Sequence, residues 1–198
     1  MPLYHRLSVW LTDTYLQDND MEEEKRSCVL YYIENMLAGA GKILLVLITA
    51  ALFGIFTETA AMLLSYTVVR QKAFGWHARK SLHCTLVSLL CFVFVPLLLQ
   101  EVEWNRFLLV GIGLLSLTLS ARYAPADTEY NPLVNRKFRR ACKIKAVLLN
   151  AVFLLISVVL GFNQWFIFGP FLEAIVITPL FYSIMRRSYA NYEQYQEC

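Results

Sequence analysis

The sequence of 198 residues is poor in charged side chains and has neither a common metal-binding pattern nor a glycine loop for phosphate. Charged residues make up 17% of the chain, against roughly 25% in soluble proteins. Its three histidines form no His-Glu-x-x-His pair. A site built from His77, His83, Cys84 and Cys91 is the metal alternative, but that spacing fits no common zinc pattern. We therefore expect no metal ion and no cofactor, and we expect no nucleic acid partner.

The sequence also lacks paired cysteines and a cleavable signal peptide. The five cysteines stand at positions 28, 84, 91, 142 and 198 without paired spacing, so we expect free thiols. The N-terminus is polar and acidic, and no short apolar core precedes a small-residue cleavage site. We therefore expect no N-terminal cleavage.

Apolar sequence is present in excess. Hydrophobic residues make up 58% of the chain, against about 45–50% in soluble proteins, and the charged residues are grouped in blocks. This pattern predicts an all-α fold, a polytopic membrane helical bundle in a single domain of residues 1–198. The bundle is expected over 38–185, with about six transmembrane helices at 38–69 (two helices), 82–99, 106–121, 146–162 and 165–185.

The N-terminal region 1–37 is not expected to span the membrane. Its first helix is amphipathic and would lie on the membrane surface or pack against the rest of the protein. A second helix, roughly 22–37, would lead into the membrane. The run 38–69 is long for one straight span and short for two. It favours a hairpin that turns near Thr57-Glu58-Thr59, with a single long tilted helix as the alternative. The amphipathic pattern of the first helix rests on Leu3, Leu7, Trp10, Leu11, Tyr15 and Leu16.

The placement of the cations predicts an orientation. With six spans and a cytoplasmic N-terminus, every Lys and Arg of the 18 in the chain except Arg106 falls on or next to the cytoplasmic side. The positive-inside rule favours this arrangement. It places both termini, the tail 186–198, the loop around residue 77 and the polar loop 122–145 together at the cytoplasmic face.

Residues 70–91 carry the candidate chemistry. They place His77 on a basic loop and Cys84 at the entrance of an apolar run, as candidate base and nucleophile. One straight helix through both residues would leave their side chains on one face but roughly 10 Å apart along the axis. A working Cys–His pair needs about 3–4 Å. We therefore infer that the loop folds back over the helix, and that Gly75 permits the bend.

The helix that carries Cys84 is predicted to begin near Ser81, which would cap it. The amide dipoles at the start of that helix and the nearby cations would favour a thiolate. The alternative is a packing cysteine beside a surface histidine. His83 points about 100° away from Cys84, and Cys91, about two turns deeper, is expected to serve packing.

Residues 70–84 resemble the AgrB family (accessory gene regulator protein B). The residues that match are Arg70, Gly75, His77, Ala78, Ser81 and Cys84. Two later stretches match as well: Tyr123-Ala124-Pro125-Ala126 with Thr128, Pro132 and a basic run ending at Lys145, then Glu173-Ala174 with Thr178-Pro179. The likeness covers most of the chain from residue 36 onward. One departure is Phe74, where many relatives carry a second glycine.

The resemblance implies a membrane cysteine endopeptidase of bacterial quorum sensing, located in the cell membrane. Cys84 would cleave a signal-peptide precursor and form a thioester with its N-terminal part, releasing an acidic C-terminal part. A Cys or Ser of the same precursor would then close the thiolactone or lactone ring of an autoinducing peptide. The rival hypothesis is a non-enzymatic peptide transporter or sensor subunit, in which His77 and Cys84 are structural.

Four further residues are candidates for supporting roles. Arg70 would hold an anionic substrate group or stabilise the oxyanion, or else contact a lipid headgroup. Ser81 would donate a hydrogen bond to the substrate or the base, and Asp127 would be the third group that orients the base. Glu173 is the one acid deep in a predicted span, so it is expected to face the interior of the bundle. There it would support the polar network, bind substrate, or steady helix packing in its protonated form.

The basic run 136–145 has two readings. Its default partner is an anionic membrane lipid, and the second is the acidic part of the precursor that the resemblance implies. We also expect a homodimer, because a bundle this small has little room to enclose a substrate cleft.

Overall fold

The structure is a computed structural model that describes residues 3–15, 23–76, 81–129 and 132–195. Within these ranges the chain is mostly helical and contains no β-strand, so the predicted all-α membrane fold is confirmed. The elements are, in order, α1 (Leu3–Tyr15), α2 (Glu23–Leu52), α3 (Phe56–Ala73), α4 (Ser81–Leu89), the π-helix η1 (Leu90–Phe94), α5 (Val95–Leu99), α6 (Arg106–Tyr123), α7 (Arg136–Val159), α8 (Trp165–Val176), α9 (Pro179–Ile184) and the 3-10 helix η2 (Asn191–Tyr195).

Among the described residues, 4 helical segments are long and apolar enough to cross a membrane: α2 from Val29 onward, the continuous α4–η1–α5 segment, α6 and α7. At most 28% of the apolar window in any of them is buried inside the chain, which leaves the rest of that surface for lipid. The predicted count of six spans is not confirmed. Helix α8 has 12 residues, or about 18 Å at 1.5 Å per residue, against a hydrocarbon core of about 30 Å.

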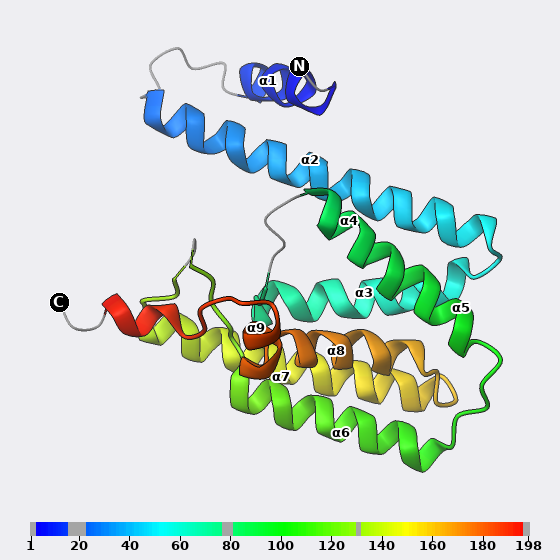
Figure 1. Cartoon of the computed structure of the whole chain (residues 1–198). Coiled ribbons are helices and arrows are strands. Elements are labelled where there is room, and N and C mark those ends of the chain that lie inside the picture. Colours follow the sequence, from blue (N-terminus) through cyan, green and yellow to red (C-terminus); the bar gives the residue numbers. More distant parts are fainter. Residues whose placement is uncertain (1–2, 16–22, 77–80, 130–131, 196–198) are drawn as a thin grey trace.

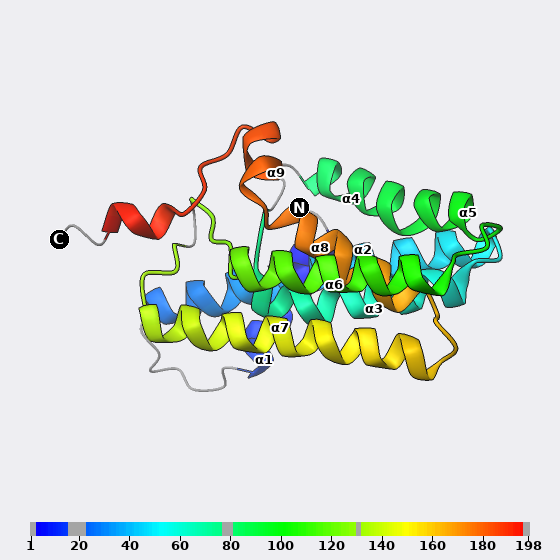
Figure 2. The ribbon, with the colours of Figure 1, turned by 90° about the horizontal axis from the view of Figure 1, so that it is seen from below.

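The long helices alternate in direction. Helix α2, the α4–α5 segment and α7 run one way, and α3, α6 and α8 run back (Figure 1). Figure 2 shows α6 and α7 side by side along their length. This alternation brings the end of α3, the end of α6 and the start of α7 to the same end of the molecule (Figure 1). Residues 185–195, here called the C-terminal segment, lie at that end as well (Figure 1).

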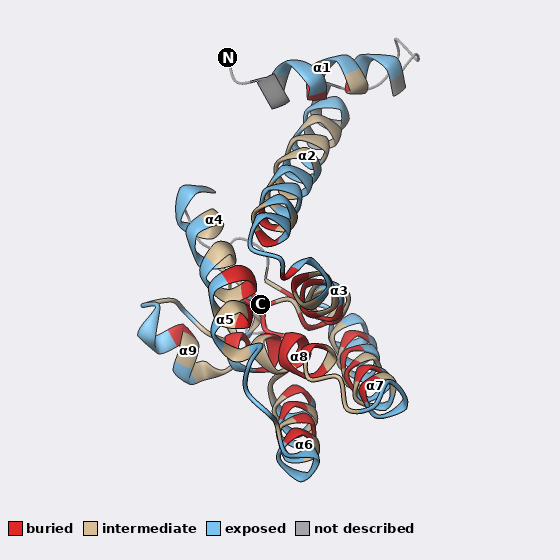
Figure 3. Cartoon of the chain, turned by 90° about the vertical axis from the view of Figure 1, so that its right-hand side faces the viewer, coloured by how far each residue is buried: buried red, intermediate tan, exposed pale blue. Residues whose placement is uncertain are grey.

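Helix α8 is the centre of the bundle. The buried residues gather on α3, α6, α7 and α8 and on part of the α4–α5 segment, whereas α1 and most of α2 stand apart from this core and are largely exposed (Figure 3). Gly169 of α8 brings two helices into close approach, because a Cβ atom there would lie 2.2 Å from Ser65 Oγ and 2.4 Å from the Met62 carbonyl oxygen of α3. Small residues allow this kind of backbone approach between membrane helices.

A polar contact joins α6 to α7 inside the apolar bundle. The buried Asn150 Nδ2 donates to Ser116 Oγ at 2.8 Å and to Ser120 Oγ at 3.1 Å. All three side chains are at most 2% exposed. Hydrogen bonds of this kind fix the facing surfaces of neighbouring helices where apolar packing alone is weakly specific.

The run 38–69 forms the predicted hairpin rather than one long helix, but its boundaries differ from those predicted. Helix α2 is continuous from Glu23 to Leu52, so no break separates the 22–37 region from the first span. The turn lies at 53–55, ahead of the predicted Thr57-Glu58-Thr59. Gly54 makes this turn with φ +74°, a conformation that glycine adopts readily. Thr59 instead lies in α3, where its hydroxyl donates to the Phe92 carbonyl oxygen at 2.7 Å.

Helix α7 begins inside the predicted polar loop 122–145. Asn135 caps it, because its side chain accepts a hydrogen bond from the Phe138 amide at 3.1 Å. The linker to α6 is therefore shorter than expected. The basic residues from Arg136 onward recur at helical spacing on the first turns of α7, where the sequence suggested irregular structure.

The predicted last span, 165–185, is broken into α8 and α9. The break follows Ile177, and Thr178 caps α9 by accepting a hydrogen bond from the Phe181 amide at 3.3 Å. Pro179 takes the first position of α9, where its missing amide hydrogen costs nothing. Two short helices therefore replace the one continuous span that the hydropathy suggested.

Helix α1 lies against α2 through its small polar side chains. Ser8 and Thr12 are buried, whereas Leu7 and Trp10 remain exposed. An ion pair between Asp13 and Arg26 joins the two helices. The structure thus packs α1 against the chain and leaves part of its apolar face uncovered, as a helix at a membrane surface would require.

The close approach of α3 and α8 yields a stability prediction. Gly169→Ala forces a Cβ atom against the Met62 carbonyl oxygen, so we expect it to lower the unfolding free energy by about 1–3 kcal/mol. Gly111→Ala in α6 is the matched control, because a Cβ atom there has no neighbour within 4 Å. Thermal unfolding in detergent micelles measures both. Equal unfolding temperatures for the two variants would contradict the packing of α8 on α3.

Candidate active site

The segment 73–76, which leads toward the predicted base, lies against the segment that follows α6. The Gly75 amide donates to the Ala126 carbonyl oxygen, and the Ala126 amide donates to the Ala73 carbonyl oxygen, both at 2.9 Å. Phe74 and Ala126 form a parallel β-bridge. Two stretches that matched the same family in the sequence are therefore joined through their main chains.

Gly75 lies where no other residue fits well. Its φ is +110°. A Cβ atom on it would lie 3.1 Å from Ile177 Cγ2 and 3.2 Å from Glu173 Oε1. Phe74 has φ +60°, which is also in the left-handed region. This explains why a second glycine suits that position, and why Phe74 occupies it at some cost in backbone energy.

A buried ion pair fixes the same segment from its other side. Arg70 Nη1 lies 2.9 Å from Glu173 Oε2, and the side chains of the two residues are 16% and 0% exposed. Arg70 Nη2 also donates to the carbonyl oxygen of Trp76. Glu173 Oε1 makes no hydrogen bond within the described part of the chain. Glu173 therefore faces the interior of the bundle as expected, and it leaves one acceptor oxygen next to Gly75.

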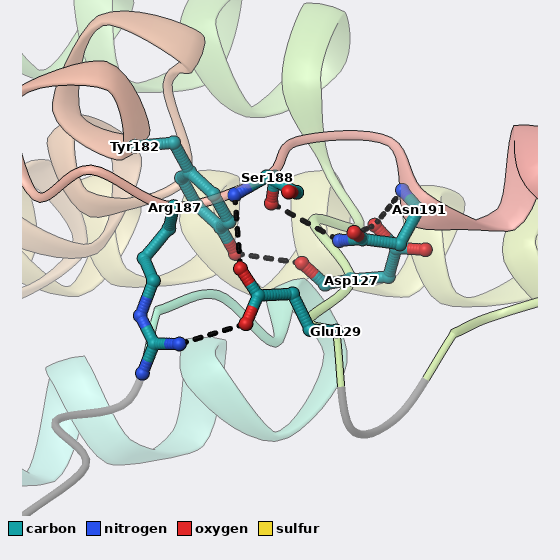
Figure 4. Close-up of polar contacts among 6 residues, drawn as sticks. All are labelled: Asp127, Glu129, Tyr182, Arg187, Ser188 and Asn191. Atoms are coloured by element: carbon teal, nitrogen blue, oxygen red, sulfur yellow. Dashed lines mark hydrogen bonds and ion pairs between the residues drawn. The ribbon is translucent and has the colours of Figure 1, made fainter.

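Asp127 is tied to the C-terminal segment. Its carboxylate accepts hydrogen bonds from the Asn191 amide at 3.0 Å and from the Tyr192 amide at 2.7 Å. The Tyr182 hydroxyl donates to the Asp127 carbonyl oxygen at 2.9 Å (Figure 4). Both carboxylate oxygens of Asp127 are thus occupied by main-chain amides. In this structure Asp127 fixes the loop after α6 to the C-terminal segment.

Glu129 adds a second link to the C-terminal segment. It forms an ion pair with Arg187 at 2.8 Å and accepts a hydrogen bond from the Ser188 amide at 3.2 Å (Figure 4). Tyr189 donates to the Tyr123 carbonyl oxygen at 3.4 Å. Burial raises the pKa of Tyr189 to about 12, so its hydroxyl stays neutral. No local pattern predicts this role of the C-terminal segment, because the partners lie more than fifty residues apart in the sequence.

Cys84 lies in the first turn of the described helix α4, close to its predicted place. It is a free, partly exposed thiol. His77 lies outside the described residues, as does the side chain of Ser81, the first residue of α4. Cys91 lies deeper, in η1, and packs against the hydrophobic core.

The structure brings together four of the predicted site residues. Arg70, Gly75 and Asp127 line a cavity of about 180 Å³. Glu173 joins this group through its ion pair with Arg70. No hydrogen bond within the described residues links Cys84 to this group, so its relation to the cavity stays a prediction. The described residues contain no group of three or more His, Cys, Asp and Glu side chains that would hold a metal ion.

Known proteins show a consistent similarity to this chain. The family model described as Accessory gene regulator B matches residues 8–185. A putative AgrB-like protein of Listeria monocytogenes serotype 4a is 35% identical over 178 residues, covering 88% of this chain and 87% of that protein. The accessory gene regulator protein B of Staphylococcus epidermidis is 33% identical over 135 residues, covering 67% of this chain and 69% of that protein. No solved structure gives a significant match.

The crowding at Gly75 is open to test with a matched pair of variants. Gly75→Ala and Gly54→Ala both place alanine at a positive φ, at a cost of about 1–2 kcal/mol each. Only Gly75→Ala adds contacts with Ile177 and Glu173, which we expect to cost about 1–3 kcal/mol more. Thermal unfolding in detergent measures the difference. Equal destabilisation of the two variants would mean that the segment 73–76 is not packed against α8.

Proposed function

Because the chain belongs to the accessory gene regulator B family, a membrane family of quorum sensing, we propose that it is a cysteine endopeptidase that processes a signal-peptide precursor. The observation that carries this proposal is a free, partly exposed thiol in the first turn of α4. The segment that leads toward that helix is held by a buried ion pair and by main-chain hydrogen bonds. Catalytic geometry needs rigid support for a base, and these contacts hold the chain up to Trp76, one residue before His77.

The proposed reaction uses Cys84 as nucleophile and His77 as base. The Cys84 sulfur attacks the scissile carbonyl carbon of the precursor, and His77 takes the thiol proton and passes it to the leaving amine. The C-terminal part of the precursor departs, and the N-terminal part stays on the sulfur as a thioester. A Cys thiol or Ser hydroxyl of that fragment then attacks the thioester carbonyl, closes the ring and returns the proton to Cys84. Because a thioester conserves acyl energy, ring closure needs no further energy source if water is kept out.

Glu173 is a better candidate than Asp127 for a group that orients His77. Its buried Oε1 has no partner in the described residues and lies next to Gly75, two positions before His77. The carboxylate oxygens of Asp127 are already occupied by amides of the C-terminal segment. A base in a Cys–His pair is usually held by such an acceptor. Arg70, ion-paired with Glu173, would keep that side chain aligned, so its support for the site would be indirect.

The substrate and the setting follow from the same proposal. The protein would be a multi-pass protein of the bacterial cell membrane, with both termini and the site at the cytoplasmic face. The acidic C-terminal part of the precursor would be attracted to the exposed cations of α7, which include Lys137 and Lys145. A homodimer would provide walls for a substrate cleft, which one small bundle has little room to enclose.

A covalent adduct provides the direct test of the nucleophile. The chain in liposomes is mixed with its matching precursor, and mass spectrometry looks for the protein joined to the N-terminal precursor fragment. We expect the adduct with the parent and with Cys91→Ala, which alters only a packing thiol. We expect none with Cys84→Ala, and cleavage slowed by roughly three orders of magnitude or more with Cys84→Ala and His77→Ala.

Two outcomes would overturn parts of this account. Undiminished cleavage by Cys84→Ala would remove Cys84 as the nucleophile. A parent that binds the correct precursor but never cuts it would favour a transporter or sensor subunit, in which Cys84 and His77 are structural.

A further inference from the structure

A basic cavity lies where α6 ends and α7 begins, next to the cavity of the candidate active site, with which it shares Ala126 and Asp127. Its volume is about 390 Å³. The C-terminal segment forms one wall through Tyr189 and Tyr192, and the end of α6, the loop 124–127 and the start of α7 form the others. Five cations line it: Arg122, Arg136, Arg139, Arg140 and Lys143.

The cations of this cavity are not neutralised by neighbouring acids. Within the described residues, Arg122, Arg136, Arg140 and Lys143 take part in no ion pair. Among the described residues that line the cavity, Asp127 is the one acid, and its carboxylate oxygens accept hydrogen bonds from the amides of the C-terminal segment. Five cations against one carboxylate leave a strong positive potential in a concave space, which attracts a multivalent anion.

The wall formed by the C-terminal segment is held in place. Arg139 stacks on the ring of Tyr192 with its Cζ atom 3.7 Å from the ring centroid. Arg139 also donates to the Leu133 carbonyl oxygen at 2.7 Å. The ion pair between Arg187 and Glu129 fastens the start of the same segment (Figure 4). The wall of the cavity is therefore fixed by contacts within the protein. Arg139 has a structural role in these contacts, and the other four cations are left to bind a ligand.

The surroundings of the cavity combine charge with apolar surface. It lies at the polar ends of α6 and α7, both of which are long and apolar enough to span a membrane. On α7, Ile144 and Leu148 follow Arg140 at steps of four residues and are 53% and 59% exposed. Residues at this spacing share one face of a helix. The anionic head of a lipid would contact the cations of the cavity, and its apolar chains would contact the exposed side chains of Ile144 and Leu148 further along α7.

We propose that this cavity binds the phosphate headgroup of an anionic phospholipid, and that it favours a lipid with two phosphates over a lipid with one. Arg136 and Arg140 hold the phosphate oxygens, since a guanidinium group binds phosphate with two parallel hydrogen bonds, and the Lys143 ammonium binds them as a point charge. The acyl chains lie along Ile144 and Leu148. Basic pockets between membrane helices at the headgroup level are suited to such lipids.

Native mass spectrometry of the full chain in nonionic detergent tests the proposal. The probes are cardiolipin with two phosphates, phosphatidylglycerol with one, and zwitterionic phosphatidylcholine. The cavity variant is Arg136→Gln with Lys143→Gln, two side chains that make no hydrogen bond with described residues. The matched control is Lys42→Gln with Arg106→Gln, which removes the same charge away from the cavity. Unfolding temperatures confirm that both variants are folded.

The expected result is a dissociation constant that rises from cardiolipin to phosphatidylglycerol to phosphatidylcholine. The cavity variant should bind cardiolipin about tenfold or more weakly than the parent, as the loss of two charge-assisted hydrogen bonds implies. The control should stay within about twofold, because surface charges away from the site contribute little. Equal weakening in both variants would overturn the proposal, because charge alone would then account for binding.

An acidic peptide serves as the competing ligand. The same titration is repeated with an octaglutamate peptide. If octaglutamate binds the parent more tightly than cardiolipin does, and loses its affinity in the cavity variant, the site belongs to an acidic peptide and the lipid proposal is wrong. Cardiolipin binding that persists in octaglutamate excess supports the lipid. This readout needs no catalysis, so its failure is separate from a failure of the proposed peptidase activity.

Discussion

The buried ion pair between Arg70 and Glu173 is the contact on which the arrangement at one end of the bundle depends. Neither charge is stable alone in an apolar interior, so each requires the other. The pair joins α3 to α8 across 103 positions of sequence. Its guanidinium also holds the carbonyl oxygen of Trp76. One interaction therefore joins two helices and holds the end of the described segment 74–76.

The same end of the molecule gathers three segments that are far apart in the sequence. Residues 73–76 bond to Ala126 through the main chain, and Asp127 bonds in turn to the amides of Asn191 and Tyr192. These hydrogen bonds form a polar network at one end of an apolar bundle. Helix α4, with its thiol, is more exposed than α3 or α8, and its position relative to these contacts stays a prediction. The proposed chemistry and the proposed lipid site thus share Ala126 and Asp127 as lining residues, but the nucleophile and the phosphate-binding cations are different residues.

Local patterns predicted the helices and one inward-facing acid, because hydropathy and the cost of a buried carboxylate act over single segments. They also predicted the hairpin of α2 and α3 and the helix start near Ser81. They missed the start of α7 at Arg136, since a cap at Asn135 outweighs the polar composition there. They gave Asp127 a catalytic part and could not find its amide partners near residue 191, because pairing across the fold leaves no periodic trace. The role of His77 stays a prediction.

A double-mutant cycle on the ion pair tests the central claim most directly. The rate at which precursor adduct forms is measured for the parent, Arg70→Gln, Glu173→Gln and the double variant in liposomes. If the pair acts as one unit, each single variant slows the reaction by about tenfold or more, because it leaves a buried charge unpaired. The double variant is then no slower than the worse single variant. Effects that multiply would show that the two residues act independently and would contradict the account.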